Sequence, residues 1–168
     1  AEVRFAEAGL ENKVRLLDDD YRNLTGQYDK LISIEMVEAV GERFLDTYFR
    51  QCGKLLKPGG RFLIDVVNRD HTMQTVPTRN WWEGDGCLIQ EDVDVDHVTS
   101  RLMIKRFVVY ADGTQREYDI TMRLFSVHEL LAMLRLVGFR YVGLSGSLHT
   151  PGAFFGAGSE RILLVVER

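Results

Sequence analysis

The sequence has no apolar run of 18 residues, so we expect no transmembrane helix. Its first residues also lack the apolar stretch of a signal peptide. There are only two cysteines, Cys52 and Cys87, which lie far apart without the spacing of metal ligands. We therefore expect reduced thiols, no metal site and a cytoplasmic protein. The net charge of −4 gives no reason to expect a nucleic acid or a membrane surface as partner.

The rest of the composition is that of an ordinary globular protein. Hydrophobic residues make up 45% of the 168 residues, and charged residues make up 27%. A chain of this length is enough for one hydrophobic core, and no segment resembles a linker between domains. We therefore expect residues 1–168 to form a single domain.

The first part of the chain alternates between helical and strand patterns. Residues 1–10 have the pattern of a helix that ends near a glycine, and residues 14–17 form a short apolar run typical of a strand. Residues 30–34 read as a strand buried on both faces of a parallel sheet. An amphipathic helix over residues 42–56 and a second buried strand over residues 61–67 follow. Strand, helix and strand of this length predict a right-handed parallel βαβ unit.

The pattern changes after residue 67. Residues 68–85 are interpreted as a mobile loop, and residues 86–124 alternate in the way that predicts an antiparallel β insertion with a hairpin turn. Ser126 and Glu129 then have the spacing of a capping box, which predicts a helix that runs to Val137. We expect two further strands over residues 139–144 and 161–166.

Several short motifs carry a resemblance to a known family. They are DYRNL at residues 20–24, SIEMVEAVG at residues 33–41 and KPGG at residues 57–60. In this order they resemble the second half of a class I S-adenosylmethionine (SAM) methyltransferase. Residues 1–67 are most similar to the cyclopropane-fatty-acid-synthase branch of that family. Residues 68–168 resemble small-molecule methyltransferases that carry a β-hairpin insertion.

The resemblance implies an α/β fold with a Rossmann-like methyltransferase sheet of strand order 3-2-1-4-5-7-6. The first two strands and the glycine-rich turn that binds SAM have no counterpart in this sequence, so residues 1–168 are expected to be a single partial domain. Residues 30–34 would then form a bare apolar edge, which proteins avoid. We therefore expect a dimer, or a completing N-terminal segment or partner, to cover this edge.

The resemblance also implies a cofactor, SAM, and places five residues near it. Asp20 and Tyr21 match the position where the family holds adenine, although a plain loop with a capping aspartate is an alternative. Ile34 and Glu35 end a strand at the edge where open α/β sheets bind ligands. Glu38 matches a carboxylate that helps to hold a bicarbonate base in cyclopropane synthases. Its structural alternative is that it begins the following helix and interacts with the helix dipole.

Two departures from the family pattern affect the predicted chemistry. Ala39 occupies the position of a histidine expected after Glu38, and Asp65 replaces the histidine expected at the end of the next strand. Cyclopropane synthesis is therefore disfavoured, and methyl transfer to oxygen or nitrogen is the better interpretation. His71 and His149 lie in predicted loops near the expected substrate entrance and are candidate general bases, although a plain surface histidine is the favoured interpretation of each.

We therefore predict an enzyme that transfers a methyl group from SAM to a small-molecule or lipid acceptor. The 168 residues by themselves are expected to bind SAM weakly or not at all and to be inactive. An alternative is a methyltransferase-like scaffold or partner subunit that binds no SAM, and a third is an unrelated α/β binding protein. The sequence does not identify the methyl acceptor.

Overall fold

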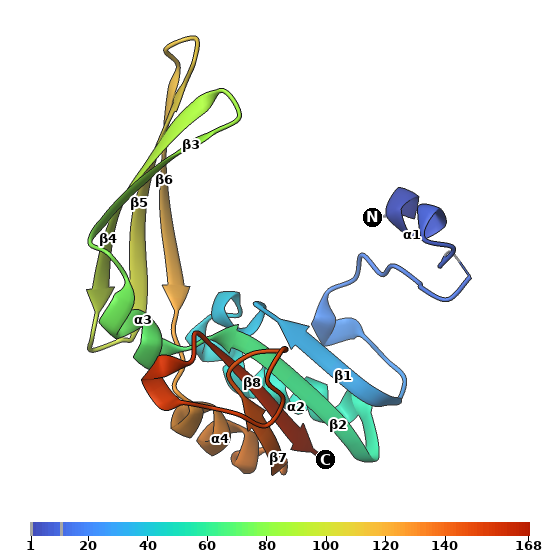
Figure 1. Cartoon of the computed structure of the whole chain (residues 1–168). Helices are drawn as coiled ribbons and strands as arrows, with labels where there is room; N and C mark the ends of the chain where they lie inside the picture. Colours follow the sequence, from blue (N-terminus) through green and yellow to red (C-terminus); the bar gives the residue numbers. More distant parts are fainter. Residues whose placement is uncertain (1, 11) are drawn as a thin grey trace.

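The computed structural model describes residues 2–10 and 12–168, which form two sheets (Figure 1). The second sheet projects away from the first. The first has the strand order β1-β2-β8-β7, with bounds Tyr28–Ile34, Leu56–Val67, Arg161–Glu167 and Arg140–Ser145. The second has the order β3-β4-β5-β6, with bounds Arg79–Gly84, Cys87–Asp96, Arg101–Tyr110 and Gln115–Arg123.

The strand directions of the first sheet match the expected second half of a methyltransferase sheet. β1 pairs with β2 in parallel, whereas β8 is antiparallel to both β2 and β7. The order β1-β2-β8-β7 corresponds to the 4-5-7-6 portion of the predicted order. The predicted Rossmann-like α/β fold class is therefore confirmed.

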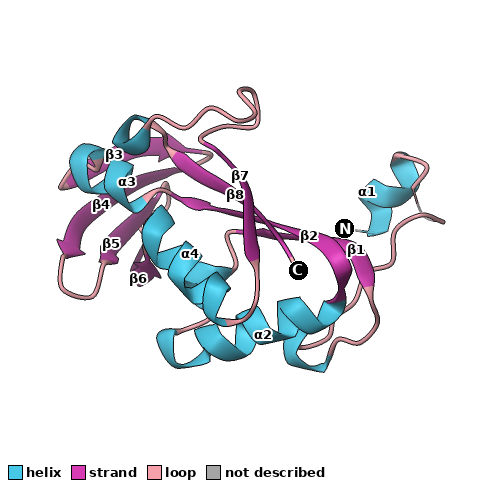
Figure 2. Ribbon diagram, turned by 90° about the horizontal axis from the view of Figure 1, so that it is seen from below, coloured by secondary structure: helices cyan, strands magenta, loops and turns pink. Residues whose placement is uncertain are grey.

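Two helices cover the same face of this sheet, as Figure 2 shows for α2 (Leu45–Leu55) and α4 (Val127–Leu136). The apolar side chains of α2 recur every three or four residues and are all buried. At the start of α4, the backbone N–H of Glu129 donates to the Ser126 hydroxyl over 3.3 Å, as the capping motif predicted. The core between sheet and helices contains Tyr48, Phe49, Phe62, Ile64, Phe125, Leu130, Leu134, Ile162 and Leu164.

The prediction that residues 30–34 would be buried on both faces is wrong. Ser33 faces α2, where its hydroxyl accepts a hydrogen bond of 2.6 Å from Tyr48. On the opposite face, Ile32 is 61% exposed and Ile34 is 64% exposed. Among the described residues, no helix covers that face and no strand pairs with the outer edge of β1. The expected bare apolar edge is therefore present.

The N-terminal segment differs from the prediction in one element. Helix α1 (Glu2–Glu7) confirms the predicted helix but ends three residues before the predicted end at residue 10, and Ala1 lies outside the described residues. Residues 14–17 form no strand, and the side chains of Val14, Leu16 and Leu17 are exposed. An apolar run becomes a strand only when another strand satisfies its backbone groups, and none lies beside these residues.

The segment 68–85 is ordered structure, which corrects its interpretation as a loop. It forms α3 (Arg69–Thr75) and then β3, so the antiparallel sheet begins before the range 86–124. The Asn68 side chain caps α3 by accepting from the backbone N–H of Asp70 over 3.1 Å. Its amide also donates to the carbonyl oxygens of Gly156 and Ser159, which fastens the loop between β7 and β8 to α3.

No helix among residues 2–10 and 12–168 is long and apolar enough to cross a membrane.

Candidate functional site

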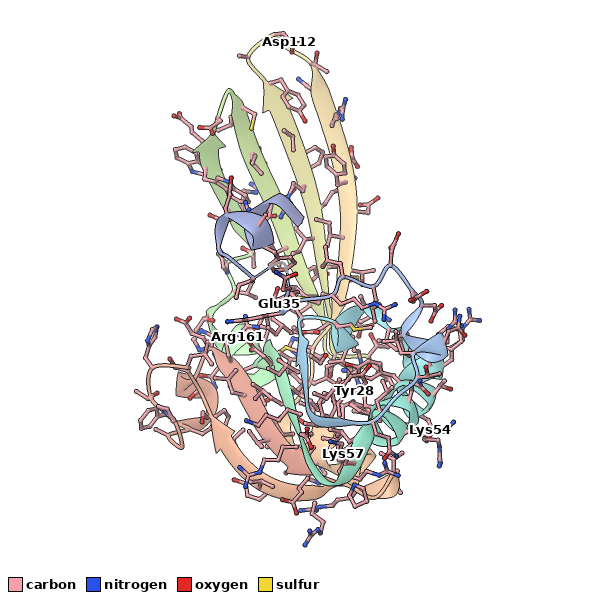
Figure 3. The ribbon with its side chains drawn as sticks, turned by 90° about the vertical axis from the view of Figure 1, so that its right-hand side faces the viewer. Tyr28, Glu35, Lys54, Lys57, Asp112 and Arg161 are labelled. Atoms are coloured by element: carbon pink, nitrogen blue, oxygen red, sulfur yellow. The ribbon has the colours of Figure 1, made fainter. Side chains whose placement is uncertain are left out.

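An ion-pair cluster lies at the edge of the first sheet where β1 and β2 end. The Arg161 guanidinium donates from Nη1 to Glu35 Oε1 over 2.7 Å and from Nε to Asp65 Oδ1 over 2.6 Å. Glu35 follows β1, Asp65 lies near the end of β2, and Arg161 begins β8. The three meet because β8 runs antiparallel to β2, so that its start lies at the same edge (Figure 3).

The backbone at Glu35 has a conformation that is uncommon for a residue with a side chain. Its φ angle is 48°, in the left-handed region. Its N–H donates to the Asp65 carbonyl over 3.0 Å, which ties the turn after β1 to β2. Such strain costs roughly 1–3 kcal/mol and is concentrated at functional sites. The backbone hydrogen bond to Asp65 and the ion pair with Arg161 thus hold Glu35 in this strained conformation.

Glu38 is the most unusual residue of this edge. It lies in the 3-10 helix η2 (Val37–Ala39), and its side chain is only 6% exposed. Among the described residues, neither of its carboxylate oxygens accepts a hydrogen bond of normal geometry, although the backbone N–H groups of Glu38 and Val67 are near enough to act on the carboxylate. Burial raises the pKa of this carboxyl, whereas the nearby backbone N–H groups of Glu38 and Val67 lower it; the charge of Glu35 acts with burial, and that of Arg161 acts against it. A buried carboxylate without a partner is costly and marks a candidate functional residue.

The structural alternative for Glu38 required it to lie at the start of the next helix. The 3-10 helix η3 (Glu42–Phe44) and then α2, which begins at Leu45, follow only after Gly41, whose φ is 81°. Glu38 is therefore outside the first turn of α2, and the dipole of that helix does not explain its burial.

Asp20 and Tyr21 lie on the β1 side of the cluster. Asp20 caps η1 (Tyr21–Asn23), and the backbone and guanidinium of Arg22 both donate to its carboxylate, which lowers its pKa to about 2. Tyr21 packs edge-on against Tyr48, with ring centroids 5.4 Å apart. The aspartate thus has the capping role that was the alternative to adenine binding, but its side chain remains partly exposed.

A small apolar hollow of about 270 Å³ lies beside Tyr21. Its walls are Tyr21, Arg22, Met36, Ala39, Val40 and Phe44. Ile34 ends β1 with its side chain on the uncovered face. Of the predicted residues, Tyr21 therefore lines the hollow, whereas Glu35 and Glu38 lie at the ion-pair cluster.

A second, larger groove lies on the β8 side and measures about 510 Å³. Asp65 and Arg161 lie in its wall together with Ser147, His149, Thr150 and Phe155. His71 is not part of this wall. Its Nδ1 donates to the Ala157 carbonyl over 2.9 Å, which favours a role in holding the loop.

Arg161 is the site residue that the sequence reasoning missed. Its signal was weak, because it is a single charge before the apolar run ILLVV at residues 162–166. Only the antiparallel direction of β8 brings it to the ends of β1 and β2.

Comparisons with known proteins agree with the fold and the motifs. Residues 1–123 match the sequence model of mycolic acid cyclopropane synthetase. Tuberculostearic acid methyltransferase UfaA1 of Mycobacterium tuberculosis is 39% identical over 83 residues, covering 48% of this chain and 19% of the relative. Cyclopropane-fatty-acyl-phospholipid synthase of Escherichia coli K12 is 41% identical over 59 residues, covering 35% of this chain and 15% of the relative. The matches thus span about a fifth or less of these curated relatives.

Two solved structures show the same fold at low sequence identity. An S-adenosylmethionine-dependent methyltransferase from Clostridium acetobutylicum has a TM-score of 0.76 at 18% identity, over 99% of this chain and 68% of that chain. The CcbJ methyltransferase from Streptomyces caelestis has a TM-score of 0.73 at 18% identity, over 88% of this chain and 61% of that chain. The family match covers well over half of the 168 residues and agrees with the motifs at residues 20–24 and 33–41. The chain therefore belongs to the mycolic acid cyclopropane synthetase family.

Proposed function

We propose that this protein takes part in SAM-dependent methyl transfer to a small-molecule or lipid acceptor. The observation that carries the proposal is the buried Glu38 carboxylate, which accepts no hydrogen bond of normal geometry and follows Glu35 of the Glu35–Arg161–Asp65 cluster by three residues. In open α/β sheets, ligands bind at this carboxyl edge. The names of the two curated relatives indicate a methyltransferase and a fatty-acyl-phospholipid synthase, which supports a lipid as one candidate acceptor.

The residues of this chain fit one part of the cofactor. The apolar hollow beside Tyr21, Met36 and Val40 suits the adenine ring, and the partly exposed Asp20 carboxylate is an acceptor for the adenine amino group. The 168 residues contain no counterpart of the glycine-rich turn that the family uses for the rest of SAM. When bound, SAM supplies an electrophilic methyl group.

The chain's own residues position the acceptor and remove its proton. Glu38 is the candidate base, because its desolvated carboxylate has no competing partner. Arg161 is a positioning residue, since its guanidinium fixes both Glu35 and Asp65. Ala39 and Asp65 stand where cyclopropane synthases have histidines, and this favours simple methyl transfer over cyclopropane formation.

The bare edge of β1 supports the further proposal that another segment completes the sheet. The occupant is a second copy of the chain or an N-terminal segment that pairs with Tyr28–Ile34. Such pairing would satisfy the free backbone groups of β1 and cover Ile32 and Ile34. It would also supply the missing part of the cofactor site.

The function is tested by incubating the intact protein with methyl-labelled SAM and following label in products by mass spectrometry. Calorimetry with SAM measures binding separately from turnover. The Asp20→Asn variant keeps a capping side chain but loses the charge, so its SAM affinity should fall. Asp29→Asn, which changes an exposed carboxylate paired with Lys57, is the matched control. Absence of both SAM binding and label transfer would favour the scaffold alternative.

A further inference from the structure

We propose, on the basis of the proposed function, that Asn68 is a positioning residue that holds one wall of the β8-side groove against the end of β2, and that this groove takes a neutral acceptor with an aromatic body. The wall in question is the part of residues 146–160, between β7 and β8, that lines the groove, and it is called the loop wall below. Asn68 follows β2 directly and is only 1% exposed. It therefore acts on a groove ligand through the loop wall and not by contact.

The polar groups of the Asn68 side chain all have partners. Its Nδ2 donates to the carbonyl oxygen of Gly156 over 2.9 Å and to that of Ser159 over 2.7 Å. Its Oδ1 accepts from the backbone N–H of Asp70 over 3.1 Å, at the start of α3. Aspartate has the same length but no donor, so asparagine alone suits this position. As a result, α3 and the 3-10 helix η4 (Gly156–Gly158) lie side by side (Figure 1).

The backbone of Asn68 makes further bonds to the same two elements. Its N–H donates to the Glu160 carbonyl over 3.0 Å. Its carbonyl accepts from both the N–H and the hydroxyl of Thr72 in α3, each over 3.0 Å. His71 of the same helix donates from Nδ1 to the Ala157 carbonyl over 2.9 Å. The end of β2, α3 and the loop wall thus meet at Asn68.

Ser159 fixes the loop wall from its other side. It is 5% exposed, and its hydroxyl accepts from the backbone N–H of Phe155 over 2.9 Å. Gly146 approaches it so closely that a Cβ on Gly146 would lie 2.2 Å from the Ser159 hydroxyl oxygen. The Gly146 N–H donates to the Ala153 carbonyl over 2.8 Å. Buried contacts therefore position the backbone of Phe155, although its side chain is 72% exposed.

The opposite side of the groove is held by strand pairing instead. Asp65 in β2 and Arg161 at the start of β8 belong to neighbouring antiparallel strands and are joined by a bond of 2.6 Å. Residues 146–160 form no strand, so no strand ladder sets their distance from this pair. The bonds of Asn68 set it. A site whose walls are already in place binds more tightly, because the ligand does not have to order them.

The side chains along the groove suit a neutral acceptor with an aromatic body. Its volume of about 510 Å³ is within the usual range for small-molecule sites. Leu148 and Phe155, each 72% exposed, and Leu163 offer apolar surface to a ring. Asp65 and Arg161 neutralise each other, and a hydroxyl group can donate to the carboxylate and accept from the guanidinium.

The test uses 2-naphthol, a neutral aromatic alcohol, and needs no SAM. Asn68→Asp keeps the shape and the oxygen that caps α3, but it turns a carboxylate oxygen towards two carbonyl groups. Fluorescence titration should show about a tenfold loss of 2-naphthol affinity, as for a wall that is in place about a tenth of the time. Asn80→Asp makes the same change at an exposed asparagine that accepts from the Trp81 N–H, and it should leave the affinity unchanged.

Hydrogen exchange followed by mass spectrometry separates positioning from a general loss of stability. In Asn68→Asp, the amides of residues 146–158 should exchange about tenfold faster, whereas those of β2 and β8 should stay as slow as in the wild type. Equal acceleration in β2 and β8 would mean general destabilisation and overturns the proposal. Unchanged exchange in the loop, or unchanged 2-naphthol affinity, also overturns it.

The wild-type protein keeps the proposal falsifiable if Asn68→Asp fails to fold. Rapid exchange of the Gly146 and Phe155 amides, which donate within the loop, would show that the wall is not preformed and overturns the proposal. The absence of 2-naphthol binding at millimolar concentration overturns it as well. Gly146→Ala displaces the same wall at Ser159 and should lower 2-naphthol affinity by a similar factor.

The proposed function fails separately from this proposal. If 2-naphthol binding depends on Asn68 but no label passes from methyl-labelled SAM to any product, the positioning role stands and the methyltransferase function fails. If label is transferred but the protein does not bind 2-naphthol, the function stands and the assignment of the groove and of Asn68 fails.

Discussion

Replacing Glu38 with glutamine should make the folded protein more stable at neutral pH. The carboxylate is buried and accepts no hydrogen bond of normal geometry among the described residues, and burial raises its pKa by more than the nearby backbone N–H groups of Glu38 and Val67 lower it. Folding therefore favours the protonated form, and ionisation at neutral pH destabilises the native state. Glutamine has nearly the same shape but carries no charge, so it removes this source of instability.

The size of the effect follows from two opposing costs. Burying an unpaired ionised group costs several kcal/mol in real proteins, whereas an unsatisfied amide costs about 1–3 kcal/mol. The expected net gain in the free energy of unfolding is about 1–2 kcal/mol at pH 8. For a chain of 168 residues, this corresponds to a rise in Tm of roughly 2–8 °C.

The pH dependence has a definite sign. A carboxyl group with a raised native pKa causes no loss of stability below its unfolded pKa, which is near 4.5. The loss grows as the pH rises from there and is complete above the raised native pKa. The difference in Tm between Glu38→Gln and wild type should therefore be smallest near pH 4 and largest at pH 8.

Thermal denaturation followed by circular dichroism across this pH range measures the effect. Glu42→Gln, the same change at an exposed site, should shift Tm by less than 1 °C at every pH. A Glu38→Gln variant that is less stable than wild type by the same amount at pH 4 and pH 8 would refute the reasoning. That result would mean that the carboxylate has stabilising partners in solution.

Three further predictions concern the cluster, the cofactor and the sheet edge. Arg161→Gln should lower the free energy of unfolding by about 2–4 kcal/mol in denaturant titrations, because it leaves Asp65 buried without its partner. The control Arg140→Gln, at an exposed ion pair, should change the free energy of unfolding by less than about 0.5 kcal/mol. Equal effects of the two variants would contradict the structural role of Arg161. Residues 1–168 as a monomer should show no micromolar SAM binding in calorimetry, because they contain no counterpart of the glycine-rich turn that binds SAM in the family. Micromolar binding would disprove the proposal that the SAM site is incomplete. Ile32→Lys should weaken any self-association seen by light scattering, because it places a charge on the exposed face of β1. Fast hydrogen exchange of the β1 backbone amides in the assembled protein would argue against a covered edge.

Local signals determined most of the elements. The spacing of Ser126 and Glu129 predicts the start of α4, because capping depends on residues three apart. The apolar stripe of α2 and the apolar run of β2 were likewise recognisable, since burial of a helix face or a central strand leaves a regular pattern. The family resemblance extended this to strand order, which the first sheet confirms. The predicted roles of Asp20, Tyr21, Ile34, Glu35 and Glu38 stay predictions.

Tertiary structure alone decided which apolar runs pair and which charges meet. The run at residues 14–17 has strand-like composition but no strand beside it, whereas Tyr28–Ile34 pairs on one side only and exposes Ile32. Arg161 is far from Glu35 and Asp65 in the chain and reaches them only through the antiparallel pairing of β8 with β2. Strand pairing and ion pairing depend on neighbours distant in sequence, and a single sequence carries no local pattern for them.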